Sequence, residues 1–211
     1  FVDCFADIPI AAERIAWGKC LNSGQTCVAP DYLLVHESVA DQLVWELNKA
    51  FKMYFGNDIL NNPEYPHMIS KHHFDRVCNL IDNHGEAARV AVGGGRDPKT
   101  LKIEPTVMTG VTLDDPVMQE EIFGPILPLI TWRKIDEAVA VTEKFGHPLA
   151  CYIFSNDTDF QQYLLHRIPF GGATINDVVI HLANNHMGFG GVGNSGMGAY
   201  HGKVGFDCFT H

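Results

Sequence analysis

Cys27 is the residue of this sequence best suited to covalent chemistry. It stands in a short loop, because the tripeptide Asn22-Ser23-Gly24 is expected to end a helix and the apolar run 32–35 has the length of a strand. A thiol in such a loop can be partly exposed, and it attacks only as the thiolate, so its site must lower an ordinary pKa of about 8.5. The alternative is a small buried hydrophobic residue, which is the usual role of a lone cysteine. The spacing alone leaves both interpretations open.

A second candidate group is a pair of acidic residues followed by an aromatic one. Glu120, Glu121 and Phe123 stand in the segment PVMQEEIFGP, residues 116–125. A carboxylate can accept hydrogen bonds from both hydroxyls of a vicinal diol, and an aromatic side chain can fix the position of a ring. The alternative is that the acids form a solvated helix end and that Phe123 belongs to the core. On these residues alone, the alternative is favoured.

The C-terminal part of the chain is rich in glycine. Residues 187–205 hold eight glycines, and two overlapping GxGxxG patterns begin at Gly188 and Gly191. A dinucleotide-binding fingerprint lies between a strand and a helix, whereas residues 181–187 do not form a clear strand pattern. We therefore predict an ordered loop or a flexible end, without a phosphate-binding role.

Composition excludes several classes of function. The net charge is −10 and no basic block occurs, which argues against a nucleic-acid partner. No apolar run approaches the ~20 residues that a membrane-spanning helix needs. The six cysteines are widely spaced without a CxxC pair, which favours a reducing, cytoplasmic location. The histidines, including His181 and His186, lack carboxylates or cysteines at ligand spacing, so we expect no metal site.

Hydrophobic periodicity predicts alternating helices and strands. A helix is expected after Asp7, a second after Ser38 with Asp41 completing a capping box and Gly56 ending it, and a third from Ser70 to a capping Gly85. A fourth helix is expected at 135–145, and the strands at 32–35, 89–92, 126–131 and 149–154. Strands that alternate with helices require crossover connections, so the expected fold is α/β with a mostly parallel sheet.

The motifs together resemble the aldehyde dehydrogenase superfamily. The segment GQTC ending at Cys27 is similar to the family's nucleophile motif, and residues 22–32 resemble the class 3 or fatty aldehyde dehydrogenase branch. The segment EEIFGP and the tail FGGVGNSGMG with YHGK resemble two further family motifs, with Gly188 where the family usually has proline. The resemblance extends over residues 1–211 and carries the three motifs in the family's order.

The resemblance assigns roles to particular residues. It implies that Cys27 is the nucleophile, which forms a thiohemiacetal with an aldehyde and then a thioester, and that its backbone N–H is one oxyanion donor. It implies that Glu121 accepts hydrogen bonds from the nicotinamide ribose of NAD or NADP, and that Phe123 packs beside the same end of the cofactor. Asn176 matches an asparagine close to the substrate pocket, although it could equally be a turn residue. The glycine-rich tail would lie near the active-site entrance.

The resemblance also implies an architecture, and it implies that several functional groups of the family lie outside this chain. Residues 1–211 would form one catalytic domain of three layers, α/β/α, in a protein that is homo-oligomeric at full length. A dinucleotide-binding domain, an asparagine that donates the second oxyanion hydrogen bond, and an ELGGK segment with the general base would lie outside this chain, the last of them just upstream of Phe1. We therefore expect the 211-residue chain alone to be weakly active or inactive towards its small-molecule aldehyde.

Two other functions remain open on the sequence. A cysteine-dependent esterase or acyltransferase could pair Cys27 with a histidine such as His181. A catalytically silent scaffold could keep the fold without the chemistry.

Overall fold

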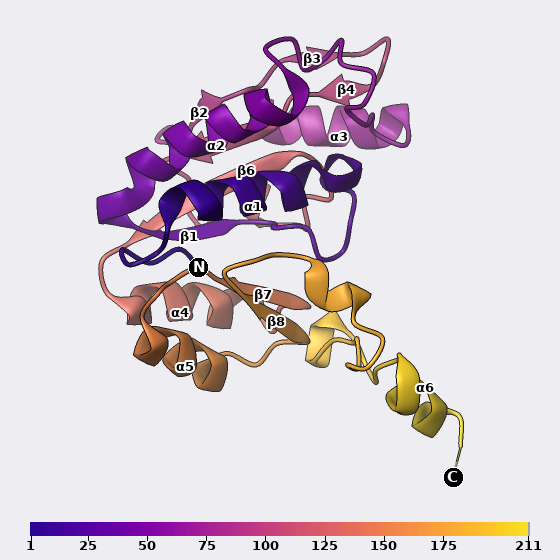
Figure 1. Ribbon diagram of the computed structural model, residues 1–211. Helices are drawn as coiled ribbons and strands as arrows, with labels where there is room; N and C mark the ends of the chain where they lie inside the picture. Colours follow the sequence, from indigo (N-terminus) through magenta and orange to yellow (C-terminus); the bar gives the residue numbers. More distant parts are fainter. Residues whose placement is uncertain (211) are drawn as a thin grey trace.

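The computed structural model describes residues 1–210, and its elements alternate between helices and strands (Figure 1). The helices are α1 (Ile8–Cys20), α2 (Ala40–Phe55), α3 (Lys71–Asp82), α4 (Ile135–Phe145), α5 (Thr158–Arg167) and α6 (Gly202–Cys208). The strands are β1 (Leu33–His36), β2 (Arg89–Val92), β3 (Arg96–Asp97), β4 (Lys102–Ile103), β5 (Thr106–Thr109), β6 (Ile126–Trp132), β7 (Ala150–Ile153) and β8 (Gly172–Ile175).

A mostly parallel sheet runs through the molecule. Four strands follow the order β1-β6-β5-β2, in which β6 is parallel to both β1 and β5, and β2 is antiparallel to β5. Strands β7 and β8 form a parallel pair. Val2 joins the two sheets, because it bridges in parallel to Val35 in β1 and to Phe154 beside β7. The predicted α/β class with a mostly parallel sheet is confirmed.

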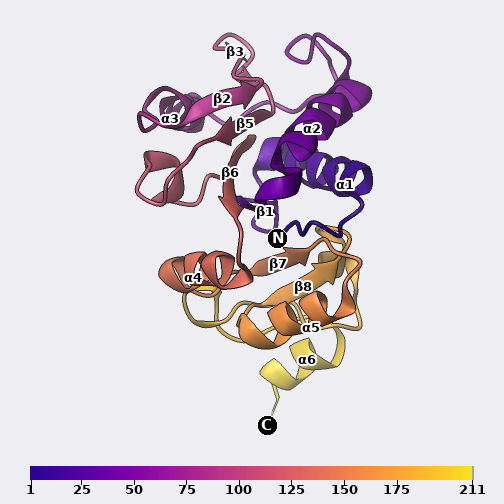
Figure 2. The ribbon, with the colours of Figure 1, turned by 90° about the vertical axis from the view of Figure 1, so that its left-hand side faces the viewer.

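The sheet is covered by helices on both faces. Successive strand residues point to opposite faces, so neighbours in β6 belong to different cores. Leu127 and Leu129 pack with the cluster that contains α1 and α2, whereas Ile126 packs with α3. In β7, Tyr152 faces α1, while Ile153 packs with α4 and α5. Figure 2 shows α1 and α2 on one side of β1, β5 and β6, with α3 and α4 on the other. These are three layers, α/β/α.

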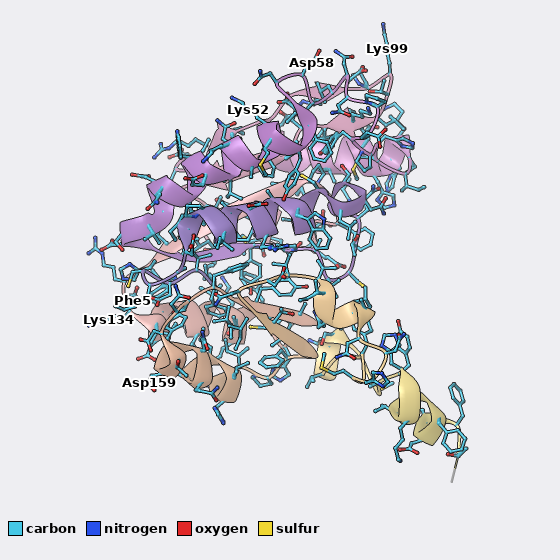
Figure 3. All side chains as sticks on the ribbon, in the orientation of Figure 1. Phe5, Lys52, Asp58, Lys99, Lys134 and Asp159 are labelled. Carbon is cyan, nitrogen blue, oxygen red and sulfur yellow. The ribbon has the colours of Figure 1, made fainter. Side chains whose placement is uncertain are left out.

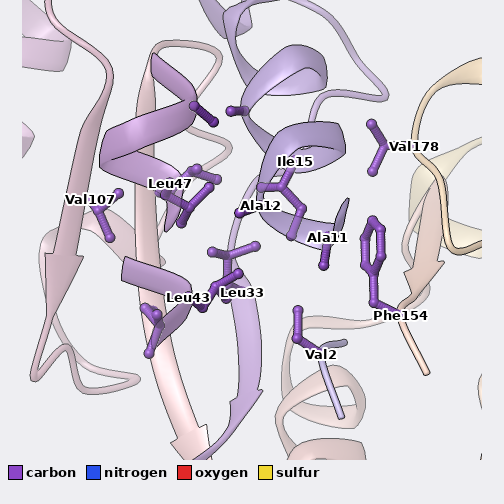
Figure 4. Close-up of a cluster of buried hydrophobic side chains, with 14 of the residues drawn as sticks. Val2, Ala11, Ala12, Ile15, Leu33, Leu43, Leu47, Val107, Phe154 and Val178 are labelled. Atoms are coloured by element: carbon purple, nitrogen blue, oxygen red, sulfur yellow. The ribbon is translucent and has the colours of Figure 1, made fainter. Parts of the chain in front are cut away.

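The largest cluster lies between the sheet and the pair α1 and α2. Figure 4 shows Ala12 and Ile15 of α1, Leu43 and Leu47 of α2 and the strand residue Leu33 gathered in one cluster. All five are at most 4% exposed, so removing any of their larger side chains would leave a cavity. Charged side chains on the outer surface point away from this core, as Figure 3 shows for Lys52, Asp58, Lys99, Lys134 and Asp159.

Three of the predicted helix ends are confirmed and two are wrong. Gly56 ends α2, with φ of 77°. The Asp7 carboxylate accepts a hydrogen bond from the N–H of Ile10, and Ser70 caps α3 in the same way. The capping box at Ser38 does not form, because the Ser38 hydroxyl is hydrogen-bonded to the His36 ring at 2.7 Å and α2 begins only at Ala40. Gly85 does not cap α3.

Helix α3 ends earlier than predicted, at Asp82, with Asn83 as its cap. Gly85 instead lies against Asp115, where a Cβ would be 2.1 Å from the carboxylate Oδ1. A close approach, rather than a left-handed cap, therefore explains this glycine.

The C-terminal part leaves the body of the molecule. Phe189 pairs with Tyr200 in an isolated antiparallel bridge, and the short helix α6 projects beyond it (Figure 1). Within residues 1–210, no helix has both the length and the apolar character needed to cross a membrane.

Candidate active site

The Cys27 loop, residues 21–31, begins with a left-handed turn. Asn22, Ser23 and Gly24 have φ values of 51°, 57° and 73°. This conformation costs about 1–2 kcal/mol per non-glycine residue, so it persists only where neighbouring contacts fix it. One such contact is buried: the Ser23 hydroxyl donates to Tyr65 Oη at 3.3 Å, and Tyr65 in turn donates to the carbonyl of Ile103 at 2.7 Å.

Gln25 stabilises the same turn through hydrogen bonds on the protein surface. Its Nε2 donates to the carbonyl oxygens of Asn22 and His67, at 2.9 and 3.1 Å, and its Oε1 accepts from the N–H of Ile69 at 2.9 Å. A single side chain thus ties the turn to itself and to residues 67–69.

The second half of the loop is fixed by two buried side chains. Lys19 Nζ donates to the carbonyl of Pro30 at 2.8 Å, and the Tyr152 hydroxyl donates to the carbonyl of Val28 at 2.6 Å. Cys27 lies next to these anchors and is exposed. The backbone around the thiol is therefore held while the thiol itself is accessible, which is the arrangement that a nucleophile requires.

The Glu121 segment, residues 119–125, is held just as firmly. The N–H of Ile122 donates to Asp31 Oδ1 at 3.1 Å, and its carbonyl accepts a hydrogen bond from the guanidinium of Arg76. The next residue, Phe123, has φ of 45°, a strained value for an aromatic residue. The Glu121 segment meets the Cys27 loop where Gly24 lies against the backbone of Gly124.

One cavity of about 590 Å³ brings the candidate residues together. Its wall includes Cys27 and Thr26 from the Cys27 loop, and Glu121 and Phe123 from the Glu121 segment. Phe123 is 39% exposed, so its ring is not the core residue that composition alone suggested. Other residues on the wall come from the end of α4, from the loop after it and from the glycine-rich tail: Phe145, Gly146, His147, Pro148, Leu149, Asn194 and Ser195.

Three charged groups lie at this cavity: Asp31 and Glu121 belong to its wall, and Lys19 is buried with an exposed fraction of 1%. Burial lowers the pKa of Lys19 to about 8, against the negative charges of Asp31, Cys20 and Glu121, which raise it. Burial raises the pKa of Asp31, although Lys19, the Ile122 N–H and Arg76 act in the opposite direction. The pKa of Glu121 is raised by burial and by Asp31.

The whole sequence, residues 1–211, matches the Aldehyde dehydrogenase family. The chain belongs to this family. It is 47% identical over 210 residues to a 4,4'-diaponeurosporen-aldehyde dehydrogenase of Staphylococcus aureus, covering 100% of this chain and 45% of that protein. It is 45% identical to the dimeric NADP-preferring aldehyde dehydrogenase of Mus musculus, covering 100% of this chain and 46% of that one. The chain thus spans about half the length of these curated relatives.

Solved structures agree with the sequence comparison. A substrate-bound Staphylococcus aureus AldH superimposes with a TM-score of 0.95 at 46% identity, over 100% of this chain and 45% of that one. Family structures at 28% identity contain NAD+ or NADP. The resemblance of this chain to the class 3 branch of the family is confirmed by the relatives at 43–47% identity.

Asn176 is not among the residues that line the cavity. Its φ is 55°, its Oδ1 accepts from the N–H of Ser155 at 3.0 Å, and its Nδ2 donates to the carbonyl of Ser155 at 3.1 Å. The amide is therefore committed to joining the ends of β7 and β8. For Asn176, the geometry supports the role of a turn residue, one of the two roles that the sequence left open.

His181 is buried and does not contact Cys27 through any hydrogen bond within residues 1–210. Its Nδ1 lies 3.4 Å from the Thr174 hydroxyl, its Nε2 is unpartnered among the described residues, and its ring packs against Tyr152. Burial lowers the pKa of His181. A Cys27–His181 pair, which an esterase would need, is therefore not formed.

The glycine-rich tail contributes to the cavity as an ordered loop. A Cβ on Gly190 would lie 2.1 Å from the carbonyl of Gly198, and one on Gly193 would lie 3.3 Å from the ring of His147. These close approaches explain the need for glycine without any phosphate role. The loop places Asn194 and Ser195 on the cavity wall.

Several site residues were not anticipated from the sequence. Lys19 and Tyr152 carried a detectable signal, because each is a polar residue within an apolar helix or strand pattern. Asp31 and Arg76 carried none, since their roles depend on contacts with Ile122, which is 91 and 46 residues away.

Proposed function

We propose that residues 1–211 form the catalytic domain of an NAD(P)-dependent aldehyde dehydrogenase that oxidises aldehydes to carboxylic acids through Cys27. The observation that carries the proposal is the shared cavity, in which an exposed thiol on a fixed loop faces the same space as Glu121 and Phe123. Covalent catalysis needs an accessible thiolate and a rigid backbone around it. The Cys27 loop supplies an accessible thiol on such a backbone.

Cys27 performs the covalent steps. Its thiolate adds to the aldehyde carbon and forms a thiohemiacetal, and its backbone N–H stabilises the oxygen that becomes negative. After oxidation the acyl group remains on Cys27 as a thioester, which water cleaves to release the carboxylic acid and the free thiol. The contacts of Lys19 and Tyr152 with the loop keep the Cys27 N–H oriented through this cycle.

Glu121 and Phe123 fit the nicotinamide end of the cofactor. A bound NAD or NADP supplies the acceptor for the hydride of the thiohemiacetal. The Glu121 carboxylate is able to accept hydrogen bonds from both ribose hydroxyls, and the half-exposed Phe123 ring can pack against the nicotinamide end. Both side chains border the cavity and are free to contact a ligand there.

The substrate class, the oligomeric state and the cellular location are proposed as well. We propose a long-chain, fatty aldehyde as substrate, and a homo-oligomer for the full-length protein, in keeping with the dimeric mouse relative. The six free cysteines support a reducing, cytoplasmic setting.

Competitive labelling with iodoacetamide at neutral pH, followed by mass spectrometry, tests the role of Cys27. Cys27 should react faster than the other exposed thiols, Cys4 and Cys208, and NAD+ should change its rate selectively. Cys4 is the matched control, because burial and the neighbouring Asp3 raise its pKa. If Cys27 reacted no faster than Cys4, a silent scaffold would be the better interpretation.

A second assay separates the proposal from a hydrolase. Ester hydrolysis without NAD that disappears in a His181→Ala variant would favour a cysteine-dependent esterase. Hydrolysis that depends on Cys27 but survives His181→Ala agrees with the dehydrogenase assignment, because thioester cleavage requires no His181.

A further inference from the structure

Both backbone polar groups of Ile122 are hydrogen-bonded to charged side chains. Asp31 Oδ1 accepts its N–H at 3.1 Å, and Arg76 donates to its carbonyl. Arg76 also donates to the carbonyl of Glu121 at 3.5 Å and pairs with the Glu120 carboxylate at 3.0 Å. The two residues beside Ile122 are the proposed cofactor contacts, Glu121 and Phe123.

The hydrogen bonds to Ile122 explain the strained backbone of the next residue, Phe123. Phe123 has φ of 45°, which an aromatic residue adopts only where its surroundings impose it. The Ile122 carbonyl lies in the peptide plane before Phe123, so rotation of that plane would break the hydrogen bond from Arg76. The Ile122 N–H lies in the preceding peptide plane, which Asp31 holds. The backbone that carries Phe123 is therefore fixed by Arg76 directly and by Asp31 one peptide plane earlier.

Asp31 also belongs to the Cys27 loop, where the buried Lys19 contacts the residue before it. Lys19 is 1% exposed, and its Nζ donates to the carbonyl of Pro30, the residue before Asp31. Burying a carboxylate and an ammonium is costly unless each offsets the charge of the other. Burial is the larger effect at both groups: it raises the pKa of Asp31 and lowers that of Lys19 to about 8, and the opposite charge of the partner reduces each shift.

We propose that Asp31 and Lys19 are positioning residues that couple the Cys27 loop to the Glu121 segment. Asp31 fixes the N–H of Ile122, the residue between Glu121 and Phe123, while the Lys19 ammonium holds the carbonyl of Pro30 and partly offsets the charge of Asp31. The nucleophile and the cofactor contacts are then set relative to one another by the hydrogen bonds of Asp31 and Lys19. The placement stands on the hydrogen bonds, and only the identity of the ligand rests on the proposed function.

Amide hydrogen exchange of Ile122, measured by NMR on the 211-residue chain, tests the coupling directly. Asp31→Ala should raise the exchange rate of the Ile122 amide by about tenfold or more relative to that of Leu129 in β6, which reports global opening. Asp31→Asn, which keeps an acceptor oxygen but loses the charge, should raise it less. An unchanged Ile122 rate in Asp31→Ala, or an equal rise at Leu129, would overturn the proposal.

The role of Lys19 as a counter-charge is tested by a double variant. Lys19→Met should raise Ile122 exchange severalfold, because Asp31 is left without its partner charge. Adding Asp31→Asn to Lys19→Met should restore part of the protection, since neither charge then remains. If Lys19 had a purely structural role, the Ile122 amide would exchange faster in the double variant than in Lys19→Met. That result would refute the role of Lys19 as a counter-charge.

Two control variants match the chemistry at other places. Lys102→Met removes a lysine that donates to a backbone carbonyl, that of Asn62, and Asp82→Ala removes the carboxylate that pairs with Arg96 at the far end of α3. Neither should change Ile122 exchange relative to Leu129. A change as large as that of Asp31→Ala would show that the effect is not specific to the pair.

A cofactor measurement distinguishes this proposal from the proposed function. Millimolar NAD+ should change the iodoacetamide rate of Cys27 in the wild type, and the change should be smaller in Asp31→Asn. Because the main dinucleotide-binding domain is expected outside residues 1–211, this measurement uses the full-length protein. If NAD+ had no effect on its wild type, the dehydrogenase assignment would lose support, whereas Ile122 exchange would still decide the coupling.

Discussion

Gly24 and Gly124 meet backbone to backbone at the junction of the Cys27 loop and the Glu121 segment. A Cβ on Gly24 would lie 2.3 Å from the carbonyl oxygen of Gly124, and a Cβ on Gly124 would lie 2.8 Å from Val77 Cγ2. Neither glycine has room for a side chain. The proposed nucleophile and cofactor contacts are thus brought together by an approach that only glycine permits.

Gly24→Ala should therefore destabilise the chain strongly. The new methyl group would clash with the Gly124 carbonyl and also force alanine to adopt φ of 73°. Strain of this kind costs about 1–3 kcal/mol, and the clash adds to it. Urea unfolding monitored by circular dichroism measures the loss.

Gly56→Ala separates the two contributions. Gly56 has φ of 77°, but a Cβ at this position would have no atom within 4 Å, so its alanine variant carries the backbone strain alone. Gly24→Ala should lose clearly more stability than Gly56→Ala. Equal losses would mean that the Gly24–Gly124 approach imposes no steric constraint.

Tyr152→Phe should cost about 1–2 kcal/mol of unfolding free energy. The variant keeps the buried ring but leaves the Val28 carbonyl without the hydroxyl that lies 2.6 Å away. Tyr163→Phe is the control, because its hydroxyl bonds to Asp136 on the surface and should contribute little. We also expect Tyr152→Phe, but not Tyr163→Phe, to change the alkylation rate of Cys27. An unaltered rate would mean that the Val28 anchor does not influence the thiol.

Much of the fold was predictable because strands β1, β2, β6 and β7 and the first four helices have recognisable hydrophobic patterns. Helix 135–145 and the strands β6 and β7 follow directly from such periodicity. Helix α5 was not predicted, since only Leu164 of its ten residues is buried and its polar composition hides the pattern. Strands β5 (TVMT) and β8 (GATI) were missed because threonine and glycine leave each with only two apolar residues, whereas the equally short β1 and β7 are mostly apolar.

The site was predictable only in part. Cys27, Glu121 and Phe123 stand in contiguous motifs, and the structure brings these three side chains to one cavity. The residues that hold them depend on tertiary contacts: Tyr152 reaches Val28 across 124 positions, and Asp31 reaches Ile122 across 91. No local pattern in the sequence encodes contacts of that length.

Asn176→Ala should lower the free energy of unfolding without changing the alkylation rate of Cys27. The variant removes both hydrogen bonds to the Ser155 backbone and places alanine at φ of 55°, which together should cost about 2–3 kcal/mol. Cys27 alkylation, measured well below the unfolding transition, should keep its wild-type rate. A large change in that rate with unchanged stability would instead support the substrate-pocket role implied by the family resemblance.

The pH dependence of stability should reveal the buried Lys19. Its pKa falls from 10.5 to about 8 on folding, so between these values the unfolded chain binds the extra proton. Stability from Lys19 therefore rises as the pH increases from 8 to 10.5, by up to about 3 kcal/mol. Below pH 8 the ammonium is charged in both states, and its burial is a constant cost.

Other groups oppose this trend, so the comparison must be made with Lys19→Met. Burial raises the pKa of Cys20 well above its ordinary 9.0, which makes folded-state stability fall once the pH exceeds that value. Subtracting the unfolding free energy of Lys19→Met from that of the wild type at each pH largely cancels this shared contribution. The difference should move in favour of the wild type by about 2 kcal/mol between pH 7 and pH 10. A difference that stays constant with pH would mean that Lys19 keeps an ordinary pKa and is not buried as a charge.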